Sequence, residues 1–117
     1  MDEDRLEELK DFIGVNFGED WDMNGDTDDA VIEAAIRLYM DSPYGLEGLY
    51  PVVPEIDLWF SADPNDETTR RFLRDEVRSY YDPEDWGQRS NEWLRKVRDR
   101  LVVGFAEDRR RRGLPSA

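Results

Sequence analysis

The sequence contains no cysteine and no histidine, and each absence removes a class of chemistry. Without cysteine the chain cannot form disulfides or thiolate metal sites, and without histidine it lacks the commonest general base and zinc ligand. No apolar run approaches the roughly 20 residues that a membrane-spanning helix needs. The chain also begins with acidic residues at positions 2–4, whereas a signal peptide begins with basic ones. We therefore expect a cytoplasmic protein.

The chain has acidic side chains in excess. Its 29 acidic and 16 basic residues give a formal net charge of −13. Such a charge repels nucleic-acid backbones and anionic membranes, so we expect neither as a ligand. A basic partner or a cation is compatible with it, and so is plain solubility. The charge is uneven, because residues 1–30 hold 12 acidic and 2 basic side chains, whereas residues 91–117 hold 4 acidic and 8 basic ones.

The length of 117 residues fits a single domain. Four tryptophans, five tyrosines and five phenylalanines supply bulky side chains for one core. We expect a helical domain over residues 1–112 and a flexible C-terminal tail over residues 113–117.

The spacing of apolar residues is helical along most of the chain, because these residues recur at intervals of three and four. Only residues 49–53 could form a strand, and Pro51 argues against it. We predict an all-α fold, a single-domain bundle of about five helices. The helices are expected at about residues 3–17, 27–40, a short stretch beginning at 54, 64–79 and 90–110.

Residues at the helix ends refine this prediction. Asp26 or Thr27 would cap the second helix, and Asp63 would cap the fourth, with Pro64 at its first position. Residues 41–54 contain several prolines and glycines, so we expect a loop with one helical turn.

The predicted core consists of Leu6, Leu9, Phe12, Ile13, Phe17, Val31, Ile32, Ala35, Ile36, Tyr39, Ile56, Trp59, Phe60, Phe72, Leu73, Val77, Tyr80, Trp93, Leu94, Val97, Leu101 and Phe105.

An acidic run, Glu19 to Asp29, lies between the first two predicted helices. Two aspartates, an asparagine and a glycine within it match positions 1, 3, 5 and 6 of an EF-hand calcium loop, but Val31 stands where position 12 needs a bidentate glutamate. Two other interpretations stay open: an acidic loop that only caps the next helix, and a partner-binding surface in which carboxylates surround an aromatic anchor. The candidate partner-binding residues of this run are Glu19, Asp20, Trp21, Asp22, Asp26, Asp28 and Asp29.

A second aromatic and acidic group spans Tyr80 to Trp86. As an ordinary helix end it would bury one tyrosine ring and expose the other hydroxyl, and Asp82-Pro83 is common turn chemistry. As an interface it would add Tyr81 and Asp82 to the candidate partner-binding residues. Both interpretations stay open.

Nothing in the sequence favours catalysis. No glycine-rich phosphate loop, serine nucleophile motif or metal-ligand cluster is present, and with 29 acidic residues some paired carboxylates are expected by chance. The four arginines at 109–112 suit the C-terminal end of a helix, where positive charge is favoured. We therefore expect no enzyme activity, no cofactor and no metal.

The segment Phe17-Gly18-Glu19-Asp20-Trp21 begins a pattern that resembles the immunity proteins of bacterial contact-dependent growth inhibition and related polymorphic toxin systems. The resemblance covers about residues 5–103 and continues through segments similar to residues 28–40, 55–59, 80–83 and 93–101. It implies a helical protein without enzymatic activity that binds the C-terminal toxin domain of a cognate effector. Such toxins are often nucleases.

The acidity and this resemblance together predict an immunity protein that masks the active site of its toxin with an acidic surface. A nuclease needs a basic surface for phosphates, and an acidic inhibitor can occupy it. We expect a monomer when the protein is free, because isolated surface apolar residues are too few for an obligate dimer. The alternatives are a calcium-binding module and an acidic adaptor for an unrelated partner.

Overall fold

The computed structural model describes residues 6–24, 26–43 and 45–113, and within these ranges the chain is helical without a strand. The five α-helices of this part are α1 (Glu7–Asn16), α2 (Asp28–Met40), α3 (Val52–Ser61), α4 (Asp66–Arg71) and α5 (Ser90–Arg111). The shorter segments are the 3-10 helices η2 (Trp21–Asn24), η3 (Gly45–Leu49) and η5 (Pro83–Trp86) and the π-helix η4 (Phe72–Glu76). The predicted all-α single-domain bundle is confirmed. Residues 114–117 of the expected tail and residues 3–5 of the expected first helix lie outside the described residues.

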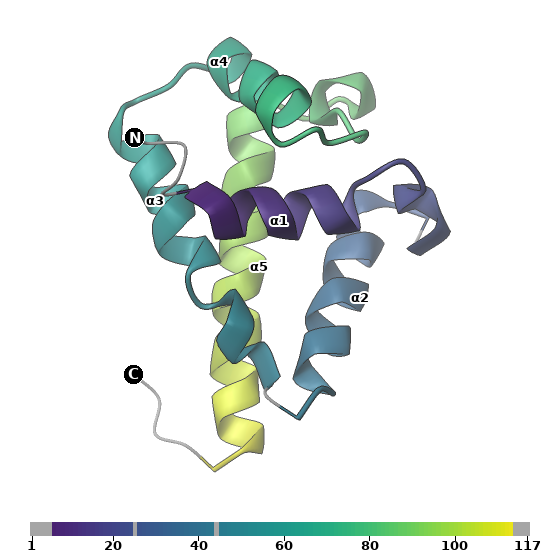
Figure 1. Ribbon diagram of the computed structural model, residues 1–117, viewed down its shortest axis with the longest axis vertical. Coiled ribbons are helices and arrows are strands. Elements are labelled where there is room, and N and C mark those ends of the chain that lie inside the picture. The colour runs from purple at the N-terminus through teal and green to yellow at the C-terminus, as the bar shows by residue number, and fades with distance from the viewer. Residues whose placement is uncertain (1–5, 25, 44, 114–117) are drawn as a thin grey trace.

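Helix α5 packs against α2, α3 and α4, and α1 packs against α2 and α3. Figure 1 shows α2 and α3 on either side of α5, α1 crossing between them, and α4 at the N-terminal end of α5. Packing follows the predicted apolar faces, and Trp93 of α5 is fully buried where α1 crosses. Its ring meets that of Phe17 edge-on at 5.1 Å between centroids. None of the described helices is long and apolar enough to cross a membrane.

The core is largely the predicted one, and its main addition comes from the stretch between α2 and α3. Leu46 and Leu49 of η3 and Val52 of α3 are buried, so this stretch is part of the core rather than a surface loop. The backbone N–H of Leu46 donates to the buried carboxylate of Asp108, 3.3 Å away in α5. In the stretch between α2 and α3, the prolines and glycines shape the path of the chain and the leucines pack in the core.

Two predictions of local structure are wrong. Asp63 does not cap α4, because its backbone has turned to a φ of 52° after the end of α3. The cap is Asn65 instead, whose side-chain oxygen accepts from the N–H of Thr68 at 2.8 Å. Tyr80 is not in the core, since it is 66% exposed and the neighbouring Tyr81 is buried in its place.

The cap of α2 is one of the two predicted alternatives. The hydroxyl of Thr27 accepts from the N–H of Ala30 at 3.1 Å, whereas Asp26 stays exposed beside it. Asp28 and Asp29 occupy the first turn of α2, where the helix dipole favours negative charge.

Candidate functional site

The two sequence segments singled out as candidate sites, 19–29 and 80–86, form one surface in the fold. The N–H of Tyr80 donates to the carbonyl of Phe17 at 2.8 Å, which fixes the second segment against the end of α1. The ring of Trp21 then meets the rings of Tyr81 and Trp86 edge-on, at 5.0 and 5.8 Å between centroids. Contacts at these distances are typical of packed aromatic pairs.

Trp21 owes its position to the turn that follows α1. Its N–H donates to the carbonyl of Gly18 at 3.0 Å, and the N–H of Met23 donates to the carbonyl of Asp20 at 3.0 Å. This short 3-10 turn leaves Trp21 half-buried against the core, with acidic side chains exposed on either side of it. The indole is therefore both part of the hydrophobic packing and part of the surface.

Asp28 lies beneath this surface and is the acceptor of a buried polar network. Its carboxylate accepts from the indole N–H of Trp93 at 2.9 Å, from the Gln88 amide at 3.2 Å and from the Lys96 ammonium at 2.6 Å. Burial by itself would raise the pKa of Asp28. The hydrogen bonds from Lys96, Gln88 and Trp93 and the charge of Lys96 outweigh burial and lower that pKa. The group is thus an ionised internal anchor between α2 and α5.

Tyr81 belongs to the same network. Its hydroxyl accepts from the Gln88 amide at 2.7 Å, and its side chain is buried. Burial, followed by the nearby negative charge of Asp28, raises the pKa of Tyr81 well above its ordinary value, so the hydroxyl stays protonated. Tyr81 and Asp28 were both candidate contact residues, but the structure gives each a supporting position under the surface.

Two other candidates, Asp29 and Asp82, are held in ion pairs within the protein. Asp29 lies 3.2 Å from the guanidinium of Arg100 and 3.3 Å from the ammonium of Lys96. Asp82 lies 2.8 Å from the guanidinium of Arg70, and its other oxygen accepts from the N–H of Glu84 at 3.1 Å. Both carboxylates therefore already have internal partners, which a binding protein would have to replace.

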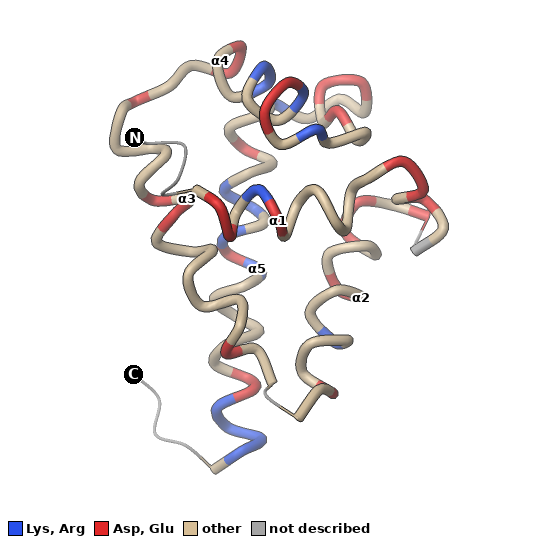
Figure 2. Tube along the Cα trace, viewed as in Figure 1, with Lys and Arg blue, Asp and Glu red and all other residues tan. Residues whose placement is uncertain are grey.

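The four remaining acidic candidates are exposed and Trp21 is half-buried, and the fold adds further residues to them. We call the resulting surface the aromatic–acidic face. It consists of Trp21, Met23 and Trp86 with the carboxylates of Glu19, Asp20, Asp22, Asp26 and Asp85. Figure 2 shows the acidic segments before α2 and in η5 at one side of the molecule, away from the arginine-rich end of α5.

Sequence reasoning left Met23, Asp85 and Trp86 out of the candidate residues. Met23 is 81% exposed and Trp86 is 61% exposed, which is unusual for such large apolar side chains. The signal available in the sequence was the Asp85-Trp86 pair next to Gly87, which ends η5 with a φ of 79°.

The described residues offer no metal site. No group of three or more acidic side chains among residues 6–24, 26–43 and 45–113 could hold a metal ion. Val31, at the position of the bidentate glutamate in a calcium loop, is buried in the core. Gly25, which would make the sharp turn of such a loop, lies outside the described residues.

Comparison with protein families gives a match over most of the chain. A family model described as CdiI immunity protein matches residues 5–101. The chain belongs to the CdiI immunity protein family. Comparisons with curated proteins and with solved structures found no match.

Membership of the CdiI immunity protein family confirms the resemblance drawn from the sequence. The family implies that the protein neutralises a toxin. The matched residues include both parts of the aromatic–acidic face and the whole Asp28 network. They end within α5, so the arginines at 109–112 lie beyond the match.

Proposed function

We propose that this immunity protein neutralises its cognate toxin by covering a basic active-site surface with the aromatic–acidic face. The observation that carries the proposal is the combination of exposed aromatic and apolar side chains with unpaired carboxylates. Trp86 and Met23 of this face are both exposed. Large side chains of this kind act as anchors in protein interfaces. In the part of the chain that the structure describes, no ion pair involves Glu19, Asp20, Asp22 or Asp26.

Most carboxylates of this face are unpaired, and among the described residues of the face only Asp85 has an ion pair, 3.6 Å from the guanidinium of Arg70. Elsewhere Asp29, Asp57 and Asp82 are each bound to an arginine of the protein itself. A carboxylate without an internal partner can pair with a cation of another protein without first giving up an ion pair. Clustered charges of one sign also steer an oppositely charged partner and raise the association rate.

We further propose that the toxin is a nuclease and that the toxin and the immunity protein meet in the cytoplasm. A nuclease holds phosphate groups with cationic side chains, and carboxylates on a protruding surface can replace those phosphates. Masking needs no chemistry from the immunity protein, so we propose no catalytic residue, no cofactor and no metal. We propose that the free protein is a monomer, with one face available to one toxin molecule.

Binding of the cognate toxin domain tests the proposal. The change Trp86→Ala removes the exposed anchor, and we expect about a tenfold to thirtyfold weaker affinity, mainly through faster dissociation. The double change Asp20→Asn, Asp22→Asn removes two unpaired charges. We expect it to slow association and to reduce the dependence of the association rate on salt. Surface-plasmon resonance at several salt concentrations measures both rates.

Matched control variants separate the face from general effects. Leu38, on α2, is 72% exposed, so Leu38→Ala removes a comparable apolar side chain and should leave affinity unchanged. The double change Glu47→Gln, Glu107→Gln alters the net charge by the same amount at exposed positions outside the face. Equal slowing by both double variants would reduce the effect to net charge. Full affinity in Trp86→Ala would place the toxin on another surface.

A further inference from the structure

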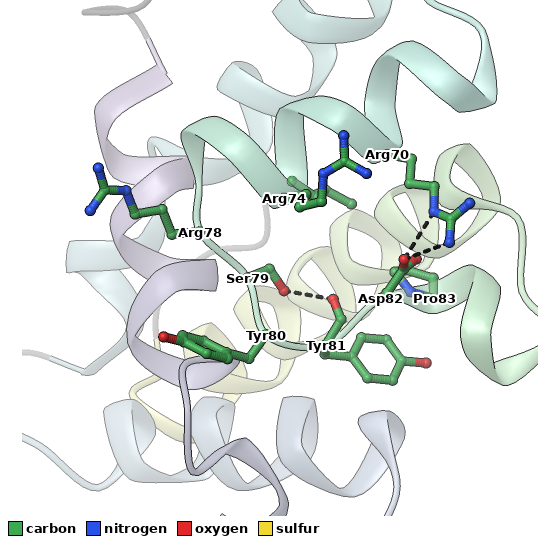
Figure 3. A pocket seen from close by; sticks show the side chains of 9 residues that line it. Arg70, Arg74, Arg78, Ser79, Tyr80, Tyr81, Asp82 and Pro83 are labelled. Atoms are coloured by element: carbon green, nitrogen blue, oxygen red, sulfur yellow. Dashed lines mark hydrogen bonds and ion pairs between the residues drawn. The ribbon is translucent and has the colours of Figure 1, made fainter.

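A cleft with positive charge borders the aromatic–acidic face of this acidic protein. It has a volume of about 440 Å³ and lies between α4 and η4 on one side and residues 79–83 on the other. Its lining includes three arginines, Arg70, Arg74 and Arg78, and one aspartate, Asp82, which gives a net charge of +2. Figure 3 shows the three arginines spaced along the helical side, with the Ser79–Pro83 segment opposite them.

The three arginines differ in how far they are already paired. Arg70 is held by Asp82 through two nitrogens, at 2.8 and 2.9 Å. Among the described residues Arg74 pairs only with its neighbour Asp75, and both side chains are about 60% exposed (61% and 60%), a setting in which an ion pair contributes little. Within the part of the chain that the structure describes, Arg78 has no ion pair. Two guanidinium groups at the cleft are thus available to an anion.

The backbone conformation at Arg78 is a second unusual feature of this cleft. Arg78 follows η4 with a φ of 62°, in the left-handed region. A helix commonly ends with a residue in this conformation, and glycine is the usual one because it has no side chain to clash. An arginine here strains the backbone, and strained residues that the surrounding fold retains are concentrated at functional sites. Arg78 lines the cleft, and Figure 3 shows its guanidinium extended away from Arg74 and Arg70, at the end of the cleft.

The cleft also offers apolar contacts. Leu73, Tyr81 and Pro83 line it and are buried, whereas Tyr80 stands at its edge with 66% of its surface exposed. Tyrosine and arginine, together with tryptophan, are enriched among the residues that dominate protein interfaces. A ligand segment that carries both a carboxylate and an apolar group would match this lining.

We infer that the cleft binds an acidic segment of the cognate toxin, with Asp or Glu carboxylates held by Arg74 and Arg78. This inference rests on the proposed function, since it assigns a second contact to the same partner. Guanidinium groups bind carboxylates through paired hydrogen bonds, which fix orientation as well as position. The interface would then carry both signs of charge, acidic on the face and basic in the cleft, and this would exclude toxins that lack the acidic segment.

The surroundings of the cleft favour a protein carboxylate over a nucleic acid. Asp85 lies 3.6 Å from the guanidinium of Arg70, and the net charge of the chain is −13. A polyanion would be repelled along most of its length, whereas a short segment with one or two carboxylates experiences mainly the local arginines.

The change Arg78→Gly tests the inference, because backbone and side chain predict opposite signs. Glycine relieves the strain of the left-handed backbone conformation, so Tm should be unchanged or higher. Removal of the guanidinium should weaken binding of the toxin domain about tenfold. Arg110→Ala, at an exposed position near the end of α5, removes the same charge and should bind like the wild type. Equal weakening in Arg110→Ala, or unchanged affinity in Arg78→Gly, would overturn the inference.

A charge-reversal experiment identifies the toxin residue. Each acidic residue of the toxin domain is replaced by lysine in turn, and one such change should restore binding to the Arg78→Glu variant. The absence of any rescue would count against a carboxylate in the cleft, as would binding of a single-stranded oligonucleotide that is lost in Arg78→Gly. The Trp86→Ala variant keeps the two proposals apart. If it weakens binding and Arg78→Gly does not, only the cleft assignment fails.

Discussion

The carboxylate of Asp28 provides the sharpest test of how the fold supports the surface above it. It is 8% exposed and is the common acceptor for Trp93, Gln88 and Lys96. The change Asp28→Ala leaves all three donors without this acceptor. Because the indole N–H of Trp93 is fully enclosed, water cannot replace the lost oxygen.

The expected loss of stability can be worked out from these contacts. An enclosed donor without an acceptor costs about 1–3 kcal/mol, and a buried ion pair that loses one partner costs about 3–5 kcal/mol. Lys96 keeps two partners, the Gln88 amide oxygen at 2.8 Å and Asp29 at 3.3 Å, so the second figure applies only in part. We expect a loss of about 3 kcal/mol, which corresponds to a fall in Tm of roughly 12 °C for a chain of this size.

Urea unfolding followed by tryptophan fluorescence measures this loss, with the slope of the transition as a check that the unfolded state is unchanged. The exposed neighbour provides the control, since Asp26→Ala should stay within about 0.5 kcal/mol of the wild type. The double variant Asp28→Ala, Lys96→Met should lose less than the two single changes added together, because the remaining charge is removed too. A loss below 1 kcal/mol in Asp28→Ala would refute the assignment of Asp28 as the anchor of the network.

The pH dependence of the same variant has a defined sign. Despite burial, hydrogen bonds and the charge of Lys96 hold the pKa of Asp28 below its ordinary value of 3.8. A carboxyl whose pKa is lower in the folded state stabilises the fold above the unfolded pKa, and this contribution is lost as pH falls through the folded pKa. The part of the difference in unfolding free energy between wild type and Asp28→Ala that depends on the Asp28 charge should therefore have its full value at pH 7. It should shrink once the pH drops below 3.8.

Two further predictions concern the frame of the bundle. Burial raises the pKa of Glu55, and the charges of Glu8 and Glu7 raise it further, although the N–H of Leu9 donates a hydrogen bond to this carboxylate. The charged form of Glu55 therefore opposes folding as the pH rises above 4.5 and through the folded pKa. Glu55→Gln should therefore raise Tm at pH 7 but not at pH 3.5 in a pH series of thermal melts, and a lower Tm at pH 7 would contradict this. Leu46→Ala should lose about 2–5 kcal/mol in urea unfolding because Leu46 is fully buried, whereas a loss under 1 kcal/mol would return residues 45–49 to the status of a surface loop.

The sequence was sufficient for the helices and for most of the core. Apolar spacing places Ile32, Trp93 and Leu101 inward whatever the neighbouring helices are, because a helix with one apolar face must bury it. Local chemistry was a weaker guide at the helix ends. Asp63 and Asn65 are both good capping residues, and only the path of the chain after α3 determines which of them points at the first turn of α4.

The candidate site was predicted as two separate segments with open interpretations. The composition of residues 19–29 showed acidic groups around an aromatic ring, but it could not show that Asp28 faces inward and Asp22 outward. That difference comes from α5, which presents Trp93 and Lys96 to Asp28 and presents nothing to Asp22. In the same way, tertiary packing against Phe17, Trp21 and Trp93 buries Tyr81, whereas Tyr80 is exposed.

By itself, the sequence determined the helical class, the acidity and the absence of histidine and cysteine chemistry, because these follow from composition and from spacing within one helix. Tertiary structure decided everything that depends on residues distant in the chain. It joined residues 19–23 and Asp26 to residues 85–86 as one face through the rings of Trp21 and Trp86, and it opened an arginine-lined cleft beside that face. The physical reason is that a hydrogen bond or ring contact needs two partners, and in both places the second partner comes from another part of the chain.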